Sequence, residues 1–307
     1  MSDSAAQGAE PDLVTVVVVT YSPGEHLSRF LSTLRSATNR PLRIVLADNG
    51  STDGVPEATA AAADDVAFLP TGGNLGYGLG ANVGAREAAT GWLVVANPDV
   101  AWKPGALDTL IAAADRWPRG AAFGPALLTE DGSLYPSARA LPSLGRGTGH
   151  ALLGWWWPTN PWTRAYRHES GTPVEGPVGW LSGSCLLLRR DAFASVNGFD
   201  PSYFMYFEDL DLCERLERAG WLCVYVPSAV CGHEGGHATA KVSHLMVAEH
   251  HRSAYRYLSR KYPGRRGLPV RVLLRLGLLA RRYASYGVGS LREGARPTRE
   301  ADVLDDV

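Results

Sequence analysis

Four hydrophobic runs in the first third of the chain are each followed by a polar loop and a segment with the period of an amphipathic helix. The runs cover residues 13–19, 42–47, 66–69 and 92–96, and the helical segments cover 25–37, 56–63, 78–89 and 104–116. Unbroken apolar runs are typical of strands that are buried on both faces. Their alternation with helices predicts an α/β fold, in which a mostly parallel sheet lies between helices.

Polar residues come just after each of these runs. They are Thr20, Asp48, Asn74 and Asp99. Right-handed crossovers bring the carboxyl ends of parallel strands to one edge of the sheet, where ligands bind in open α/β folds. We therefore expect these four side chains to line one crevice, although they lie tens of residues apart in the chain.

Asp99 belongs to the segment NPD, residues 97–99, in which the proline ends the strand because it cannot donate to a sheet ladder. A carboxylate at this edge can hold a hard divalent cation, and the cation can hold a diphosphate. The alternative is a turn that only ends the strand. His233, in the glycine-containing loop 233–237, could complete a metal site or be a surface residue.

The glycine-rich stretch 72–82 follows the third run and precedes a helix. It does not match G-x-G-x-x-G, and a dinucleotide fingerprint belongs after the first strand rather than the third. An NAD-linked enzyme is therefore disfavoured. We expect the glycines to let the backbone approach a ligand closely.

A second group of acidic residues, Glu208, Asp209 and Asp211, directly follows the aromatic-rich segment 204–207. Acids in the first turn of a helix oppose its dipole, which is a sufficient explanation for Asp211. Apolar neighbours also raise the pKa of a carboxyl group, as a general base requires. We also expect a charged helix over residues 208–219.

Later parts of the chain are less regular. We expect strands over 121–128, 179–188 and 221–226, and a helix over 243–262. The segment 130–176 is rich in proline, glycine and tryptophan, which is typical of a functional lid or loop. Its tryptophans 155–157 are candidates for an acceptor or membrane-interface contact, or for a packed lid.

The whole chain has 307 residues, 45% of them apolar, and a formal net charge of −1, so we expect no nucleic-acid partner. Its four cysteines lack metal-site spacing and are typical of buried, reduced thiols in a cytosolic protein. Residues 1–11 lack the features of a signal peptide and predict a disordered leader. We find no apolar run of the length that a transmembrane helix needs.

From residue 267 onward, apolar residues recur at helical spacing with arginines between them, and residues 301–307 are acidic. A basic amphipathic helix is typical of binding to a membrane surface, but it could equally pack on the preceding domain. We divide the chain into the leader 1–11, a catalytic domain 12–262 and a C-terminal extension 263–307. The domain would comprise a nucleotide-binding half, 12–128, and an acceptor half, 129–262.

Several segments taken together resemble the family 2 glycosyltransferases over roughly residues 13–262. They are VVTY (18–21), ADNGSTDG (47–54), GNLGYG (73–78), NPD (97–99), GSC (183–185), EDLDL (208–212) and the late His233. Segments 135–139, 160–162 and 178–185 are most similar to the rhamnosyltransferase branch that acts in actinobacterial cell-wall linker synthesis. The resemblance implies a fold of the nucleotide-diphospho-sugar transferase (GT-A) type.

The resemblance also implies a reaction, the inverting transfer of L-rhamnose from dTDP-rhamnose to polyprenyl-diphosphate-linked N-acetylglucosamine. Two alternatives stay open: another nucleotide sugar used in polysaccharide or O-antigen assembly, or a non-catalytic sugar-nucleotide-binding subunit. A lipid acceptor implies a peripheral protein at the cytoplasmic face of the plasma membrane, since anionic headgroups attract arginines. A homodimer is among the assemblies that we consider.

Roles follow from the resemblance residue by residue. The nucleotide sugar would contact Thr20, Tyr21, Asp48, Asn49, Asn74, Gly76, Gly78, Asn97 and Asp99. The acceptor side would comprise Trp180, Gly183, Ser184 and Glu208. Asp99 and His233 would hold Mg²⁺ or Mn²⁺, and Asp209 would be the general base. Because Asn97 stands where the family often has aspartate, Asp99 would be the main protein carboxylate on the cation.

Overall fold

The computed structural model describes residues 13–88, 90–141, 173–233 and 243–279. The chain divides into two compact units, residues 1–241 and 242–307. The helix expected over 243–262 falls within the second of these units. The expected leader, the tryptophans 155–157 and the acidic tail fall outside the described residues.

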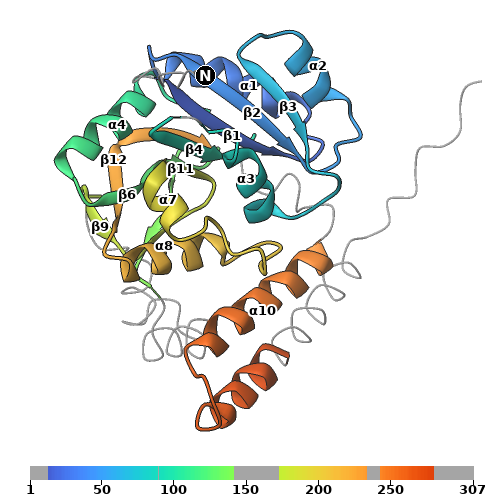
Figure 1. The fold of residues 1–307 in the computed structure, drawn as a ribbon, viewed down its shortest axis with the longest axis vertical. Coiled ribbons are helices and arrows are strands. Elements are labelled where there is room, and N and C mark those ends of the chain that lie inside the picture. The colour runs from blue at the N-terminus through green and yellow to red at the C-terminus, as the bar shows by residue number, and fades with distance from the viewer. Residues whose placement is uncertain (1–12, 89, 142–172, 234–242, 280–307) are drawn as a thin grey trace, which may run out of the picture. The chain divides into compact units, whose positions relative to one another are not determined.

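The first unit is built on a mixed sheet (Figure 1), whose main path within the described residues runs β3-β2-β1-β4-β11-β6-β12-β5. These strands are β1 (Val14–Thr20), β2 (Leu42–Asp48), β3 (Val66–Pro70), β4 (Trp92–Ala96), β5 (Val100–Trp102), β6 (Gly120–Leu128), β11 (Cys185–Arg189) and β12 (Leu222–His233). The short strands β7 (Leu134–Tyr135) and β9 (Gly176–Val178) extend this sheet. A separate pair is formed by β8 (Ala138–Arg139) and β10 (Trp180–Leu181).

The four strands β3, β2, β1 and β4 are parallel, as the alternation of strands and helices predicts. Their carboxyl ends therefore lie at one edge. Strand β11 runs antiparallel between β4 and β6, and β5 runs antiparallel to β12. A buried strand has the same apolar run whether it lies parallel or antiparallel to its neighbours. The sequence pattern therefore could not predict that β11 and β5 are antiparallel.

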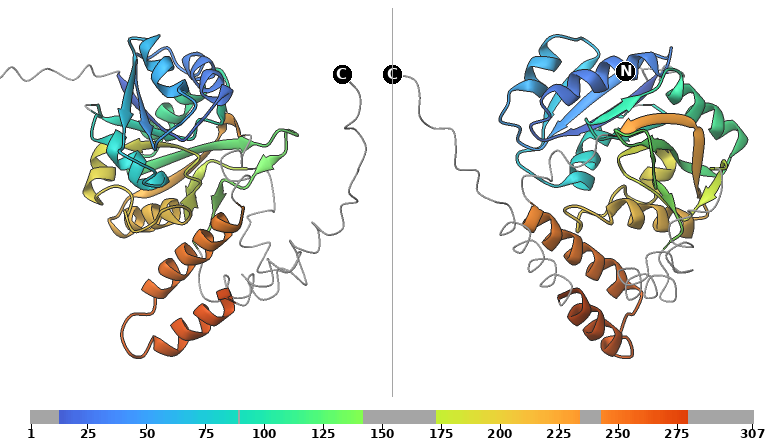
Figure 2. Two further views of the ribbon diagram at one scale, coloured as in Figure 1. Left: turned by 90° about the vertical axis from the view of Figure 1, so that its right-hand side faces the viewer. Right: turned by 180° about the vertical axis from the view of Figure 1, so that it is seen from behind.

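Helices cover both faces of the sheet (Figures 1 and 2). On one face lie α1 (Glu25–Ser36), α2 (Val55–Ala61) and α4 (Ala106–Arg116), and on the other lie α3 (Tyr77–Ala85), α7 (Arg190–Ser195) and α8 (Glu208–Arg218). Side chains along β1 alternate between the two cores, because successive residues of a strand point to opposite faces. Val16 and Val18 join the core beneath α1, and Val17 and Val19 join the core beneath α3.

Three strand expectations need correction. The strand expected over 179–188 is broken into β10 and β11 by a turn at residues 182–184. Strand β5 was not expected, because three residues are too few to show a pattern. Strand β12 does not stop at Val226 but continues through an irregularity to His233, so this histidine ends a strand instead of lying in a loop.

The second unit contains α10 (Ser243–Arg260) and a further helical segment over residues 268–279. Large apolar side chains of this segment are exposed: Leu268, Val272, Leu273, Leu276 and Leu279. A search of the described residues finds no helix with both the length and the apolar character needed to cross a bilayer.

Candidate functional site at the carboxyl edge of the sheet

Strand pairing brings two candidate metal ligands together. His233 at the end of β12 pairs with Val100 at the start of β5, which places the imidazole beside Asp99. The His233 Nε2 and Asp99 Oδ1 atoms lie 3.5 Å apart, and both side chains are largely buried. Neither atom has a hydrogen-bond partner within the described parts of the chain. The ring of Tyr135 packs edge-on against the imidazole, with ring centroids 5.8 Å apart.

Asp209 lies in the first turn of α8 and is held by backbone donors. The N–H of Gly183 donates to its Oδ2 at 2.9 Å, and the N–H of Leu210 donates to its Oδ1 at 2.8 Å. Burial raises the pKa of Asp209, an effect that these two N–H groups and the charge of Arg139 only partly oppose. A carboxylate with a raised pKa and fixed orientation suits proton abstraction.

Glu208 precedes this aspartate and is buried, with Oε2 lacking a partner among the residues described. Burial, and then the charge of Asp209, raises the pKa of Glu208 to about 8. The chain enters the helix through two residues with positive φ, Tyr206 at 66° and Phe207 at 67°. Such backbone conformations are costly for non-glycine residues and persist where the surroundings impose them.

Tyr77 at the start of α3 connects these acidic groups. Burial, followed by the charge of Glu208, raises the pKa of Tyr77 well above its ordinary value. Asp209 and Asp99 also contribute to this rise. Tyr77 therefore lies within electrostatic range of both the candidate metal ligand and the candidate base.

The loop after β2 is built around Asp48, which is buried. Thr20 Oγ1 donates to Asp48 Oδ1 at 2.7 Å, and the N–H groups of Gly50 and Ser51 donate to Oδ2 at 3.0 and 2.9 Å. Burial alone would raise the pKa of Asp48, but the hydrogen bonds from Ser51, Thr20 and Gly50 hold it below its usual value. This carboxylate therefore organises the loop, and contact with a nucleotide stays a prediction.

Asn49 is likewise buried and joins two further loops. Its amide donates to the Gly76 carbonyl at 3.0 Å and accepts from the Thr71 hydroxyl at 3.0 Å. Asn74 Oδ1 accepts from the Gly76 N–H at 3.1 Å. Tyr21, by contrast, is half exposed, and its side chain is open to a ligand from solvent.

The glycines at the start of α3 have a role that differs from the one expected. A Cβ on Gly76 would overlap the backbone of Phe204, and one on Gly78 would lie 2.9 Å from the Phe199 Cβ. These glycines thus let α3 approach the segment before α8, rather than only a ligand. Their part in nucleotide binding remains a prediction.

The acceptor-side candidates lie around the turn between β10 and β11. The Asn97 N–H donates to the Ser184 carbonyl at 2.9 Å, which ties this turn to the end of β4. The guanidinium of Arg139 lies over the Trp180 ring, 5.4 Å from its centroid. The structure thus brings the predicted residues of β4, β12, α8 and this turn to the same edge of the sheet.

The chain matches two family models. Residues 15–196 match "Glycosyl transferase family 2", and residues 164–284 match "Glycosyl transferase family group 2". The chain belongs to glycosyl transferase family 2. Both the predicted family and the predicted fold class are thereby confirmed.

Two curated relatives align with most of this chain. An N-acetylglucosaminyl-diphospho-decaprenol L-rhamnosyltransferase of Mycobacterium tuberculosis (strain ATCC 25618 / H37Rv) is 52% identical over 296 residues, which cover 93% of this chain and 96% of the relative. The rhamnosyltransferase WbbL of Escherichia coli (strain K12) is 30% identical over 81% of this chain and 94% of its own length.

Solved structures show the same fold at low sequence identity. GalNAc-T7 with UDP, GalNAc and Mn²⁺ superposes with a TM-score of 0.55 at 16% identity, covering 74% of this chain and 44% of that chain. S. aureus TarS 1-349 superposes with a TM-score of 0.50 at 14% identity, covering 77% and 64%. These two structures support only the fold of this chain and say nothing of its substrates.

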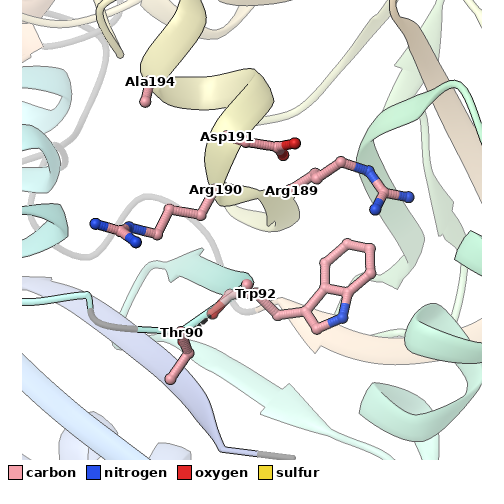
Figure 3. Close-up of a pocket in the computed structure, with 7 residues that line it drawn as sticks. Thr90, Trp92, Arg189, Arg190, Asp191 and Ala194 are labelled. Atoms are coloured by element: carbon pink, nitrogen blue, oxygen red, sulfur yellow. Dashed lines mark hydrogen bonds between the residues drawn. The ribbon is translucent and has the colours of Figure 1, made fainter. Parts of the chain in front are cut away.

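A pocket of about 580 Å³ lies away from this site. It is lined by Thr90, Gly91, Trp92, Arg189, Arg190, Asp191 and Ala194 (Figure 3). Trp92 begins β4, so the pocket lies at the opposite edge of the sheet from Asp99. Figure 3 shows Arg189 reaching toward the Trp92 ring, and Arg189 also donates to the Gly120 carbonyl at 3.1 Å. The predicted site residues of the glycosyltransferase do not line it.

Three residues of the site were not assigned roles from the sequence: Tyr77, Tyr135 and Arg139. Each lies inside a segment that carries the family resemblance, so position in the sequence could have marked them. Their roles depend on contacts across the fold, with Gly183, His233 and Trp180 respectively. A single sequence does not display such contacts.

Proposed function

We propose that this glycosyltransferase moves L-rhamnose from dTDP-rhamnose to N-acetylglucosaminyl-diphospho-polyprenol with inversion at the anomeric carbon. The observation that carries the proposal is the 52% identity, over 96% of its length, to a relative named for that acceptor and that sugar. A second relative, from Escherichia coli, is also named as a rhamnosyltransferase. The buried acidic residues at the carboxyl edge of the sheet supply the chemistry that such a transfer needs.

Asp209 is the base in this proposal. The donor sugar already carries a good leaving group, so no enzyme nucleophile is required; the acceptor hydroxyl must lose its proton as it attacks. The oxygens of Asp209 are oriented by the N–H groups of Gly183 and Leu210. The carboxylate keeps at least one further lone pair, because each backbone N–H uses only one of its four. The proton of the acceptor hydroxyl passes to this carboxylate as the acceptor oxygen bonds to the anomeric carbon and the bond from that carbon to the diphosphate breaks, which releases dTDP.

We propose Asp99 and His233 as the protein ligands of a divalent cation, Mg²⁺ or Mn²⁺. Because these cations bind their ligands at roughly 2.1 Å, one ion can contact two atoms only if they lie within roughly 4 Å of each other. The 3.5 Å between Nε2 and Oδ1 meets this condition, and both atoms lack hydrogen-bond partners in the described chain. A bound cation would neutralise charge on the departing diphosphate.

The described residues hold no group of three or more His, Cys, Asp or Glu side chains placed for a metal. Two protein ligands are enough when the substrate's phosphates and water complete the shell, which is common for Mg²⁺. His233 would bind through neutral Nε2, since a protonated imidazole has no lone pair for a metal.

The decisive experiment offers the purified protein a panel of nucleotide sugars with a short-chain polyprenyl-diphosphate-N-acetylglucosamine, with and without a chelator. We expect rhamnosylated lipid and dTDP only when dTDP-rhamnose, acceptor and Mg²⁺ or Mn²⁺ are all present. Transfer of a different sugar would show that the assignment of dTDP-rhamnose as donor is wrong. Nucleotide binding without any transfer would support the alternative of a non-catalytic subunit.

We further propose that residues 268–279 bind an anionic membrane surface at the cytoplasmic face, where a lipid acceptor would be found. Support comes from the exposed fractions of Leu268, Leu273 and Leu276, which are 52%, 69% and 58%, and from the neighbouring arginines. Burial of apolar area and attraction between arginines and anionic lipids both favour such binding. The homodimer stays a prediction.

Cosedimentation with phosphatidylglycerol vesicles tests the membrane proposal. Leu273→Asp should reduce binding about tenfold, because it removes buried apolar area and adds a repelled charge. Leu134→Asp, at a leucine of the first unit that is also exposed, is the matched control and should bind normally. If the wild type bound phosphatidylcholine and phosphatidylglycerol vesicles equally, the proposed attraction between its arginines and anionic lipids would be wrong.

A further inference from the structure

The turn between β10 and β11 is held at Gly183 from two sides. On one side its N–H donates to Asp209 Oδ2 at 2.9 Å. On the other side its carbonyl accepts a hydrogen bond from the Tyr77 hydroxyl. Gly183 itself is buried. A single residue thus connects the phenol of α3 with the candidate base of α8.

The absence of a side chain at Gly183 is what allows this arrangement. A Cβ there would lie 3.2 Å from the Asp209 Cβ and 3.3 Å from the Tyr77 Cε1. Both distances are shorter than ordinary carbon–carbon contact. The tyrosine ring and the aspartate therefore both lie beside the position that a side chain of residue 183 would occupy.

The backbone and the ring of Tyr77 are also held by neighbouring residues. Its backbone N–H donates to the Phe204 carbonyl at 3.1 Å, and its ring packs edge-on against Phe199 with centroids 6.1 Å apart. Asn82 of the same helix hydrogen-bonds both the N–H and the carbonyl of Phe199, at 2.9 and 2.7 Å. Contacts of α3 with Phe199 and Phe204 therefore hold Tyr77, whose hydroxyl donates to Gly183.

We propose that Tyr77 is a positioning residue for Asp209: by holding Gly183, it fixes the orientation of the carboxylate that receives the acceptor's proton. The inference rests on the proposed function, since it takes Asp209 as the base. Its physical basis is that a catalytic group must be held within a fraction of an ångström of its productive position, and that small displacements cost large factors in rate.

Tyr77→Phe tests this inference because it removes the hydroxyl and keeps the ring. We expect kcat for transfer to fall about 10- to 100-fold, with the Kd for dTDP and the acceptor KM changed less than about threefold. Tyr225→Phe is the matched control, since Tyr225 is a buried tyrosine on β12 that has no part in the site; its kcat should equal that of wild type.

A double-mutant cycle separates positioning from a general structural effect. If Tyr77 acts through Asp209, its loss should cost much less in an Asp209→Glu background, where the carboxylate is already displaced. Equal losses in both backgrounds, or a parallel rise in the dTDP Kd, would overturn the inference. Gly183→Ala provides a second variant should Tyr77→Phe fold poorly. Its Cβ would displace the same two groups, so kcat should fall again, and an unchanged kcat would count against positioning.

The two proposals fail in different ways. An Asp209→Asn enzyme with normal turnover would remove the base assignment and the inference with it. An inactive Asp209→Asn enzyme together with a fully active Tyr77→Phe enzyme would leave the base assignment intact and reject only the role of Tyr77.

Discussion

Carboxyl groups at two places along the same sheet edge have opposite environments. Asp48, after β2, accepts protein hydrogen bonds at both oxygens, and these hold its pKa below the usual value. Asp99 and Glu208, after β4 and at the start of α8, each keep a buried oxygen without a hydrogen-bond partner in the described chain. For Glu208, burial raises the pKa to about 8.

This difference marks Asp48 as a carboxylate that organises its loop, and leaves Asp99 and Glu208 as candidates for chemistry. A buried polar atom without a partner is costly, and folded proteins keep few of them unless function requires it. Within the described chain, hydrogen bonds satisfy both carboxyl oxygens of Asp48, whereas Asp99 and Glu208 each keep one buried oxygen unsatisfied. Substitution should therefore cost stability at the first place and activity at the second.

The largest expected effect is on catalysis at Asp209. Asp209→Asn keeps the shape of the side chain but removes the base, so we expect kcat to fall by about 10²–10⁴-fold. Calorimetric binding of dTDP should be unchanged. Transfer assays on the variant check this, and turnover near the wild-type rate would contradict the assignment.

Asp48→Ala should give the largest loss of stability. It leaves donors of Thr20, Gly50 and Ser51 without their acceptor, so we expect the free energy of unfolding to fall by about 2–4 kcal/mol. Urea denaturation measures it. Asp99→Ala is the matched comparison and should lower this free energy much less, because its Oδ1 has no hydrogen bond to lose. Equal losses would remove the distinction between the two places.

A smaller effect is expected on donor binding at Asp99. With Mg²⁺ or Mn²⁺ present, Asp99→Ala should weaken dTDP binding about 10- to 100-fold, in the range typical for losing a ligand-shell residue. With chelator, wild type and variant should bind dTDP equally weakly. Titration calorimetry under both conditions decides the matter, and an unchanged affinity in the presence of metal would argue against a ligand role.

The smallest effect concerns the pH dependence of stability at Glu208. Its pKa is about 8 in the folded protein, above the ordinary value of 4.5, so the folded state holds a proton that the unfolded chain releases. The stability contributed by Glu208 is thus fully present below about pH 4.5 and is lost as the pH rises toward 8.

Glu208→Gln carries no titratable group at this position, so between pH 7 and pH 8.5 it should lose about 1–2 kcal/mol less stability than wild type. Thermal unfolding in chelator at the two pH values provides the measurement. Parallel losses in both proteins would show that Glu208 does not titrate in this range.

The sequence predicted the elements whose signals are local. Strand β4 ends before Pro98, and α8 begins at Glu208 and is followed by Gly220, because proline, charge and glycine act on their own segment. Asn74 also lies in a loop, as the pattern predicts, whereas Asp48 is the last residue of β2 rather than the first residue after the strand. Expectations failed where a long-range contact decides, as in the broken strand at Gly183 and the extension of β12 to His233.

What the sequence determined by itself is thus the family, the alternation of strands and helices, and the set of candidate site residues. Only the tertiary structure decided that His233 lies beside Asp99, through the pairing of β12 with β5, and that Tyr77 and Asp209 meet at one glycine. The physical reason is that hydrophobic period and turn chemistry act over a few neighbouring residues. Strand order and side-chain contact depend on the packing of the whole sheet.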